Sequence, residues 1–337
     1  MPLSLRERGW GEGRGSHKRT TMSYPHPALR ATFSRWEQGT ATHLCRRGSL
    51  KPVTQDSPAT TSLPAGAVRR EVLRHRAGIS ARVSDAVAEE IPIAFVYNER
   101  PHAVMLATPS DLEDFALGFS LSEAIIAESG EFQGVEIAPA LAGIELRISV
   151  PEARAAVLDQ RVRQLTGRTG CGLCGAQTLD AAVRHPPPVA DPAPIERAAL
   201  HRALGELQRG QNINSVTGAT HAAAWAMSDG RVVLVREDVG RHNALDKLIG
   251  AMQGEKLDCA QGFLVVTSRA SYEMVMKSAT VGIGIIAAIS APTALAITLA
   301  QEANVTLIGF ARPDGYSIYS HAQRVDSSAQ RNRSTAS

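Results

Sequence analysis

Residues 262–312, GFLVVTSRASYEMVMKSATVGIGIIAAISAPTALAITLAQEANVTLIGFAR, decide the fold class of this chain. Three apolar runs in this stretch, GFLVVTS, IGIIAAIS and VTLIGFAR, have the length and composition of strands, and segments with helical periodicity separate them. Continuous apolar strands that alternate with helices are typical of a parallel sheet covered on both faces. We therefore predict an α/β fold, a three-layer sheet with helices on both faces, plus a smaller N-terminal α+β part.

Composition and periodicity divide the chain into five parts. Residues 1–65 and 326–337 show no sustained pattern and are predicted to be disordered tails, the first of them basic. Short strand and helix patterns alternate in residues 66–184, which form the α+β part. The proline-dense HPPPVADPAP at 185–194 cannot form a regular helix or strand, so it predicts a linker. The α/β domain then occupies residues 195–325.

Within the α+β part, IPIAFVYNERPHAVMLAT at 91–108 predicts two strands around a turn at 98–101. The next residues, 109–129, predict a helix whose start has a capping box of Ser110 and Glu113. Its apolar stripe would consist of Leu112, Phe115, Ala116 and Phe119. Further elements are predicted as a strand at 143–150, a helix that begins at Pro151, a helix at 195–210 and a hairpin around Asp229 and Gly230.

The balance of charges argues against a nucleic-acid-binding surface on the folded part. The chain has 36 Lys/Arg and 33 Asp/Glu, but residues 1–65 hold 10 of the former and 4 of the latter, so the remainder is slightly acidic. Four cysteines are too few for a secreted disulfide scaffold, which favours a reducing cytoplasm. No apolar run predicts a membrane span. The opening lacks a signal-peptide core, and its Gly- and Arg-rich sequence favours a functional start at Met22 or later.

Two of the cysteines lie three residues apart in TGRTGCGLCGAQTLD, residues 166–180. Such a pair can hold half a zinc site, cycle between dithiol and disulfide, or present one sulfur as a nucleophile. A structural zinc site needs four ligands, and the remaining cysteines, Cys45 and Cys259, are single and distant, so no metal is predicted. A thioredoxin-like pair would follow a strand, whereas Cys171 and Cys174 follow a predicted helix among glycines. A mobile nucleophile and a plain flexible loop both remain open.

Polar residues also gather where predicted strands meet helices. VREDVGRHNALDKLIGAM at 235–252 has several of them at such a junction, where α/β folds bind ligands, although a capped helix with internal salt bridges explains them equally. They are Glu237, Asp238, Arg241, His242, Asn243 and Asp246. VTSRASYE at 266–273 places Arg269 at a helix N-terminus, which favours an anion. GFARPDGYSIYSH at 309–321 has a turn at 313–315 and can be an edge hairpin alone.

Together these stretches resemble the formate dehydrogenase accessory sulfurtransferase family (FdhD/NarQ). The resemblance runs in one order from about residue 67 to 325 and rests most strongly on EDVGRHNALDK, since CxxC alone is common. The other matching stretches are IPIAFVYNERPHAVMLATPSDLEDFALGFSLSEAII, CGLCG, TSRASYEMVMKSA, AISAPTALAI and GFARPDGYSIYSH.

The resemblance implies a cytoplasmic, homodimeric sulfur carrier with a cytidine-deaminase-like fold and no zinc chemistry. A cysteine desulfurase would load sulfane sulfur onto Cys171, and the protein would pass it to the molybdenum bis(molybdopterin guanine dinucleotide) cofactor before insertion into formate dehydrogenase. Cys174 matches the family's second cysteine, and its role stays open. The cofactor would be bound as a substrate, with no permanent cofactor, nucleic acid or membrane partner. The family's cofactor-binding segment falls on Phe310, Ala311, Arg312, Pro313, Asp314 and Gly315.

Two other functions fit the same residues. A non-catalytic carrier or chaperone would bind the cofactor without passing sulfur to it, and a dithiol oxidoreductase would need both Cys171 and Cys174 equally. Sulfur transfer needs a nucleophilic thiolate on a loop that meets two partners, which the glycines around Cys171 would permit. The roles of Asp238, His242 and Arg269 are not decided by the sequence.

Overall fold

The computed structural model describes residues 62–156, 158 and 184–325, which belong to one compact unit. The CxxC motif, nearly all of the predicted N-terminal tail and the C-terminal tail lie outside these residues. Hydrophobic side chains of the predicted α+β part and of the predicted α/β domain belong to one core. The division of the chain into these two parts therefore stays a prediction. Residues 184–194 form neither helix nor strand, as their proline content predicts.

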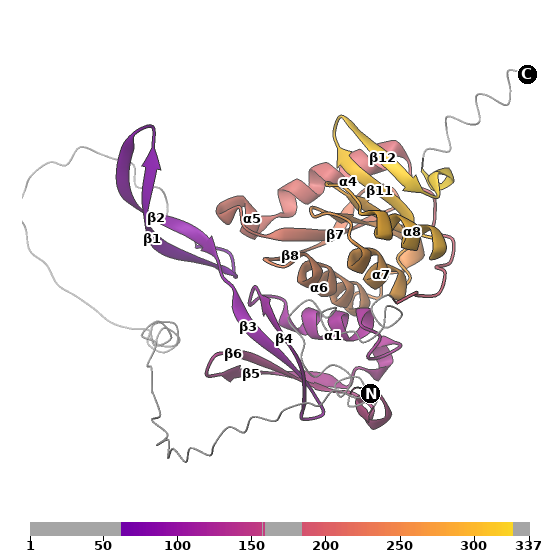
Figure 1. Ribbon diagram of the computed structural model, residues 1–337, viewed down its shortest axis with the longest axis horizontal. Coiled ribbons are helices and arrows are strands. Elements are labelled where there is room, and N and C mark those ends of the chain that lie inside the picture. Colours follow the sequence, from indigo (N-terminus) through magenta and orange to yellow (C-terminus); the bar gives the residue numbers. More distant parts are fainter. Residues whose placement is uncertain (1–61, 157, 159–183, 326–337) are drawn as a thin grey trace, which may run out of the picture. The chain divides into compact units, whose positions relative to one another are not determined.

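A six-stranded sheet lies at the centre of the C-terminal part (Figure 1). Three neighbouring strands are parallel, and the strands on either side of them pair antiparallel. The predicted parallel sheet and the hairpin at Asp229 and Gly230 are therefore confirmed. The strands in sheet order are β12 (Gly315–Ser320), β11 (Thr306–Arg312), β10 (Ile285–Ala288), β9 (Gly262–Val266), β7 (His221–Met227) and β8 (Val232–Asp238).

Helices cover both faces of this sheet, which confirms the predicted three layers. Side chains alternate along each strand, so Leu264 packs toward α6 (Arg241–Gly254), α7 (Tyr272–Thr280) and α8 (Ala294–Glu302). Phe263 and Val265 pack on the opposite face, against α4 (Arg197–Gly210). No helix among the described residues is long and apolar enough to cross a membrane.

A second sheet of four strands carries α1 (Leu112–Ser122) on its inner face. The predicted strand pair is confirmed as β3 (Ile91–Tyr97) and β4 (Arg100–Ala107), and the strand predicted at 143–150 is β6 (Gly143–Ser149), with β5 (Gly134–Ala140) at the edge. All four residues of the predicted apolar stripe on α1 are buried. Because α1 also packs against α6, it joins the two sheets into one core.

The predicted capping box at the start of α1 is wrong. The N-cap is Asp111, whose left-handed backbone (φ 53°) cannot present a side chain to the first turn, and the Ser110 hydroxyl has no partner among the described residues. The helix is also shorter than predicted. Ala124 is left-handed, and Ile125 and the next residue donate to the Ser120 carbonyl, which turns the chain away.

The sequence reading missed a two-stranded ribbon, β1 (Ala67–Arg76) and β2 (Ile79–Ala88). All ten residues of each strand pair antiparallel around a turn in which Ala77 and Gly78 are both left-handed (φ 50° and 79°). The ribbon stands out in Figure 1 as a long arm. The remaining short elements are α5 (Asn212–Thr217), η2 (Ser129–Glu131), η3 (Cys259–Gln261) and η4 (Ala322–Arg324).

Helices α1 and α6 cross so closely that two glycines are required. A β-carbon on Gly118 would lie 1.7 Å from the Asp246 carbonyl oxygen, and one on Gly250 would lie 1.9 Å from the Asp114 carbonyl oxygen. Both distances are far inside van der Waals contact, and both opposing atoms belong to backbone. The two helices therefore touch main chain to main chain.

We expect Gly250→Ala to lower the free energy of unfolding by about 1–3 kcal/mol, because the methyl group must push α1 away from α6. Gly254 lies in the same helix with open space around its α-carbon. Gly254→Ala should therefore be neutral or stabilising by up to about 1 kcal/mol. Urea unfolding of both variants measures the difference; equal stabilities would contradict the close crossing.

Candidate functional site

The carboxyl ends of the parallel strands form the candidate ligand edge. β9 ends at Val266, β10 at Ala288 and β11 at Arg312, while antiparallel β7 begins here and β8 ends here. In α/β sheets this edge is where ligands bind. Neighbouring strands lie about 4.8 Å apart, so the four intervals from β11 to β8 give the edge a length of about 19 Å.

At this edge Asp238 is a structural residue. Its carboxylate lies 2.7 Å from Lys247 Nζ and accepts hydrogen bonds from the Thr108 and Gly240 amides and from the side chain of Asn243. Neither Asp238 nor Lys247 has any exposed side-chain surface. Of the two explanations that the sequence left open, internal pairing is correct for this residue.

Glu237 also serves the fold. Its carboxylate accepts hydrogen bonds from the amides of Ile213 and Asn214, both at 2.8 Å, and from the Thr220 hydroxyl at 2.9 Å. It therefore caps the N-terminus of α5, which lacks a cap of its own.

A buried ion cluster connects α6, α7 and the end of α1. Lys277 Nζ lies 2.8 Å from Asp246, 2.9 Å from Glu123 and 3.0 Å from the Ser122 hydroxyl. Burial lowers the pKa of Lys277, but the two carboxylates outweigh burial and raise it. Burial likewise raises the pKa of Glu123, yet Lys277 and Arg184 lower it to about 2. Burial also raises the pKa of Asp246, although Lys277 and the Ser122 hydroxyl act to lower it.

Other polar groups at the edge face no such internal partner. Arg241 Nε and Ser271 Oγ are buried, and neither atom forms a hydrogen bond with another described residue. Both begin helices: α6 and α7 have no side-chain cap, whereas Thr293 caps α8. Two helix starts without a side-chain cap, beside an arginine, favour an anion.

His242 and His221 flank Arg241 at this end of the edge. His242 Nε2 lies 2.8 Å from Glu273 Oε2, and His242 lowers the pKa of Glu273. Burial lowers the pKa of His221, and the nearby Arg241 and His242 lower it further. The described groups thus form a cationic corner in which one carboxylate, Glu273, is in contact with His242.

The segment Phe310–Gly315 lies at the far end of the same edge. Phe310 is 44% exposed and left-handed (φ 51°), and its amide donates to the Ser290 carbonyl. Arg312, Pro313 and Asp314 are exposed in the turn between β11 and β12, while Ala311 is buried. Arg269 is exposed between the two ends. The structure therefore places the predicted cofactor-binding segment and the cationic corner on one edge.

Cys171 and Cys174 lie outside the described residues. Arg184, the first described residue after them, is held at the start of α7, where its amide donates to the Tyr272 hydroxyl and that hydroxyl donates to its carbonyl. Its guanidinium also pairs with Glu123. Burial raises the pKa of Cys259 to about 11, so this thiol is a poor nucleophile. The described residues contain no cluster of three metal-binding side chains.

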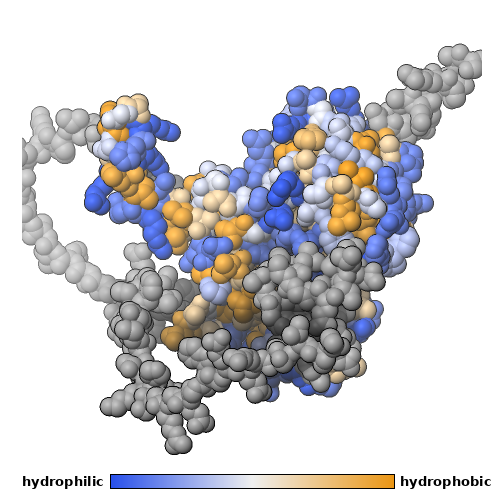
Figure 2. Space-filling view, in the orientation of Figure 1, coloured by the Kyte–Doolittle hydropathy of each residue, from blue (hydrophilic) through white to orange (hydrophobic). Residues whose placement is uncertain are grey.

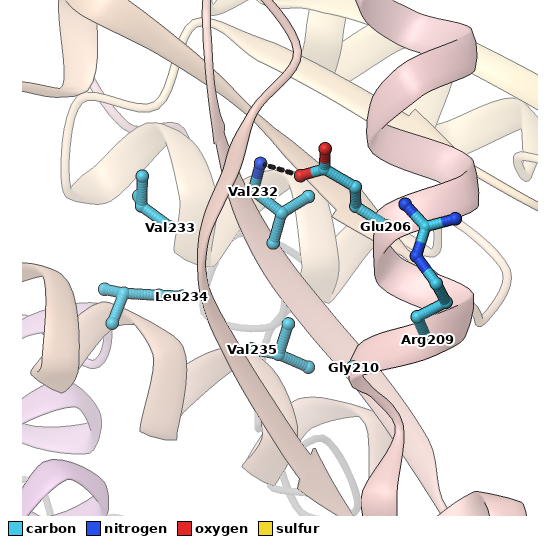
Figure 3. A pocket seen from close by; sticks show the side chains of 7 residues that line it. All are labelled: Glu206, Arg209, Gly210, Val232, Val233, Leu234 and Val235. Carbon is cyan, nitrogen blue, oxygen red and sulfur yellow. Dashed lines mark hydrogen bonds between the residues drawn. The ribbon is translucent and has the colours of Figure 1, made fainter.

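A surface groove lies away from the ligand edge, between α4 and β8 (Figure 3). It has a volume of about 360 Å³ and is lined by Glu206, Arg209, Gly210 and the valine-rich start of β8. Glu206 accepts a hydrogen bond from the Val232 amide at 2.7 Å, which blocks part of the free edge of β8. We assign it no part in the site.

The model of the FdhD/NarQ family matches residues 88–326. The chain belongs to the FdhD/NarQ family. It is 56% identical over 270 residues to the sulfur carrier protein FdhD of Xanthomonas euvesicatoria pv. vesicatoria (strain 85-10), covering 80% of this chain and 96% of that protein. A protein of the same name from Bordetella petrii is 53% identical over 256 residues, 75% and 92% of the two chains.

The fold is also similar to a crystal structure described as a formate dehydrogenase accessory protein from Desulfotalea psychrophila. The TM-score is 0.60 at 23% identity, over 77% of this chain and 99% of that one. This likeness supports the mixed α/β fold of the family. The cytidine-deaminase-like detail stays a prediction.

Sequence reasoning missed Glu123 and Lys277, the residues that complete the buried cluster. A lysine within the apolar MVMKSA of α7 is a signal, because a lone charge among buried positions needs a partner. No pattern in the sequence could identify that partner, since Glu123, Asp246 and Lys277 come from three separate helical regions.

We expect Lys277→Met to destabilise the protein by about 3–5 kcal/mol, because Asp246 then stays buried without its counter-charge. Arg154→Met is the matched control: Arg154 Nε lies 2.9 Å from Glu131, but this pair is partly exposed. Its loss should cost less than about 1 kcal/mol. Thermal unfolding followed by circular dichroism compares the two, and similar losses would show that burial of the cluster does not matter.

Proposed function

We propose that this protein carries sulfur to the molybdenum bis(molybdopterin guanine dinucleotide) cofactor that formate dehydrogenase receives. Relatives that are more than half identical to this chain are named sulfur carrier proteins, and the match covers almost the whole length of each relative. A cysteine desulfurase in the cytoplasm supplies the sulfur, and the protein acts as a homodimer. Family membership is the observation that carries this proposal.

Cys171 is the proposed sulfur acceptor. Its thiolate attacks the terminal sulfur of the desulfurase persulfide, so one S–S bond forms, another breaks, and the desulfurase cysteine leaves as a thiolate. Cys171 then holds the sulfur as a persulfide until the cofactor arrives. After Cys171, the described part of the chain resumes at Arg184, which lies beside Tyr272 at the start of α7. This position supports delivery to the ligand edge.

The charge along the edge supports a cofactor with phosphates at both ends. Each guanine dinucleotide half carries a pyrophosphate, and the edge offers Arg312 near β11 and Arg241 with two uncapped helices near β8. A length of about 19 Å between the two ends suits an elongated, doubly anionic ligand rather than a small one.

We expect a desulfurase and cysteine to add one sulfur atom to the wild-type protein, on the peptide that contains residues 171–174, as detected by mass spectrometry. Cys171→Ala should abolish the added mass, and Cys174→Ala should retain it. No added sulfur on the wild type, where a control acceptor is loaded, would reject sulfur carriage. Cofactor binding and activation of formate dehydrogenase that survive Cys171→Ala would instead favour a cofactor chaperone.

We also expect Arg241→Met and Arg312→Met each to weaken binding of guanosine diphosphate about tenfold to a hundredfold, because each removes a charge-assisted hydrogen bond to phosphate. Calorimetric titration measures the affinity. Arg209→Met, in the groove beside β8, is the control and should bind as the wild type does. Equal affinity in all three variants would remove the ligand edge from the proposal.

A further inference from the structure

The β1–β2 ribbon is exposed over nearly its whole length. Leu73 and Ile79 keep 59% and 71% of their surface exposed, and α5 provides its main contact with the rest of the described chain. A two-stranded ribbon by itself is only marginally stable in water. A ribbon ten residue pairs long, about 34 Å, therefore requires a further surface to pack against.

One face of the ribbon combines apolar and basic residues. Val72 pairs with Val83 and Val68 with Val87, and the same face also carries Arg70, Arg74 and Arg76. The ribbon as a whole has five arginines and two acidic residues, one of which, Asp85, is paired with Arg74. A complementary surface would be acidic around an apolar centre.

The outer face of the four-stranded sheet has this character. Helix α1 covers the opposite face, while on the outer face Val104 and Leu106 of β4 are 62% and 57% exposed. Ala94 lies between Val104 and Glu145 in the sheet register, so a carboxylate, which pairs with Arg147 at 3.0 Å within its own chain, borders the apolar strip. Apolar residues are visible along the ribbon and β3–β4 in Figure 2.

Charge favours the same surface. Residues 89–156, which build the four-stranded sheet and α1, contain 12 Asp/Glu and 3 Lys/Arg. The exposed Glu90 and Glu99 lie at the two ends of β3. The ribbon is thus basic and the sheet acidic within one chain, and only two residues, Glu89 and Glu90, separate β2 from β3.

We propose that the ribbon of one copy packs across the outer face of the four-stranded sheet of a second copy, and that the second copy does the same in return. Such a twofold arrangement uses the same surfaces on both chains and closes as a dimer. Valines of the ribbon cover Val104 and Leu106, and Arg70 and Arg76 lie against Glu90 and Glu145. The proposed dimer gains a specific interface, independent of the ligand edge.

The test is a charge reversal on each side of the interface in the full chain. The ribbon variant is Arg70→Glu with Arg76→Glu, and the sheet variant is Glu90→Arg with Glu145→Arg. We expect each variant alone to dissociate into monomers of 35.9 kDa in sedimentation velocity, with the dissociation constant raised at least about tenfold, because like charges then oppose one another. An equimolar mixture should form dimers again, since both interfaces of the mixed pair regain opposite charges.

Circular dichroism and thermal unfolding show whether the variants remain folded, and Arg209→Glu with Lys256→Glu is a control that should dimerise as the wild type does. A monomeric wild type, variants that still dimerise, or a mixture that stays monomeric would each overturn the proposal. Monomer in all samples, with weaker binding of desulfurase or formate dehydrogenase by the ribbon variant, would assign the ribbon to those partners instead. Sulfur loading of Cys171 is measured separately and stands whichever result is obtained.

Discussion

The buried contact of Lys277 with Asp246 and Glu123 holds together the parts of this protein that matter most for its chemistry. It lies where α1, α6 and α7 converge, behind the ligand edge, and Glu123 extends it to Arg184, the point at which the cysteine-bearing segment joins the described structure. Charges buried in an apolar core tolerate few arrangements, because each must keep its partner. The cluster therefore fixes the relative positions of the helices that begin at the ligand edge.

The same region explains why EDVGRHNALDK is such a specific motif. Its acidic residues and Lys247 point inward and are satisfied by the protein itself: Glu237 caps α5, and Asp238 holds the turn at Thr108. Arg241 and His242, one turn further, remain at the surface of the edge. A single stretch thus combines residues that build the corner with residues that can bind an anion, and only burial separates the two groups.

The alternation of apolar strands and helices in residues 262–312 was sufficient to predict the parallel sheet and its two helical layers, because that pattern has few physical solutions. The capping box at Ser110 failed because the N-cap is Asp111, which has a left-handed backbone and makes no side-chain cap. The ribbon was missed because its Ala77–Gly78 turn lacks the asparagine or aspartate of the strongest hairpin signals. The ligand-edge segments were found by their polar residues at strand ends, but the pairing of Asp246 with Lys277 depends on tertiary packing.

The close crossing of α1 and α6 sets a further limit on how this site can vary. Gly118 and Gly250 bring the helix backbones into contact, so α1 cannot shift away from α6 without opening the shared core and exposing Asp246. The four-stranded sheet is attached to the ligand edge through α1 and through the end of β4, where Asn243 donates to the Leu106 carbonyl and Asp238 accepts from the Thr108 amide. Any force on the sheet, such as a partner bound to its outer face, is therefore transmitted to the helices that begin at the edge. A rigid connection of this kind lets one surface hold a partner while the opposite side keeps its anion-binding geometry.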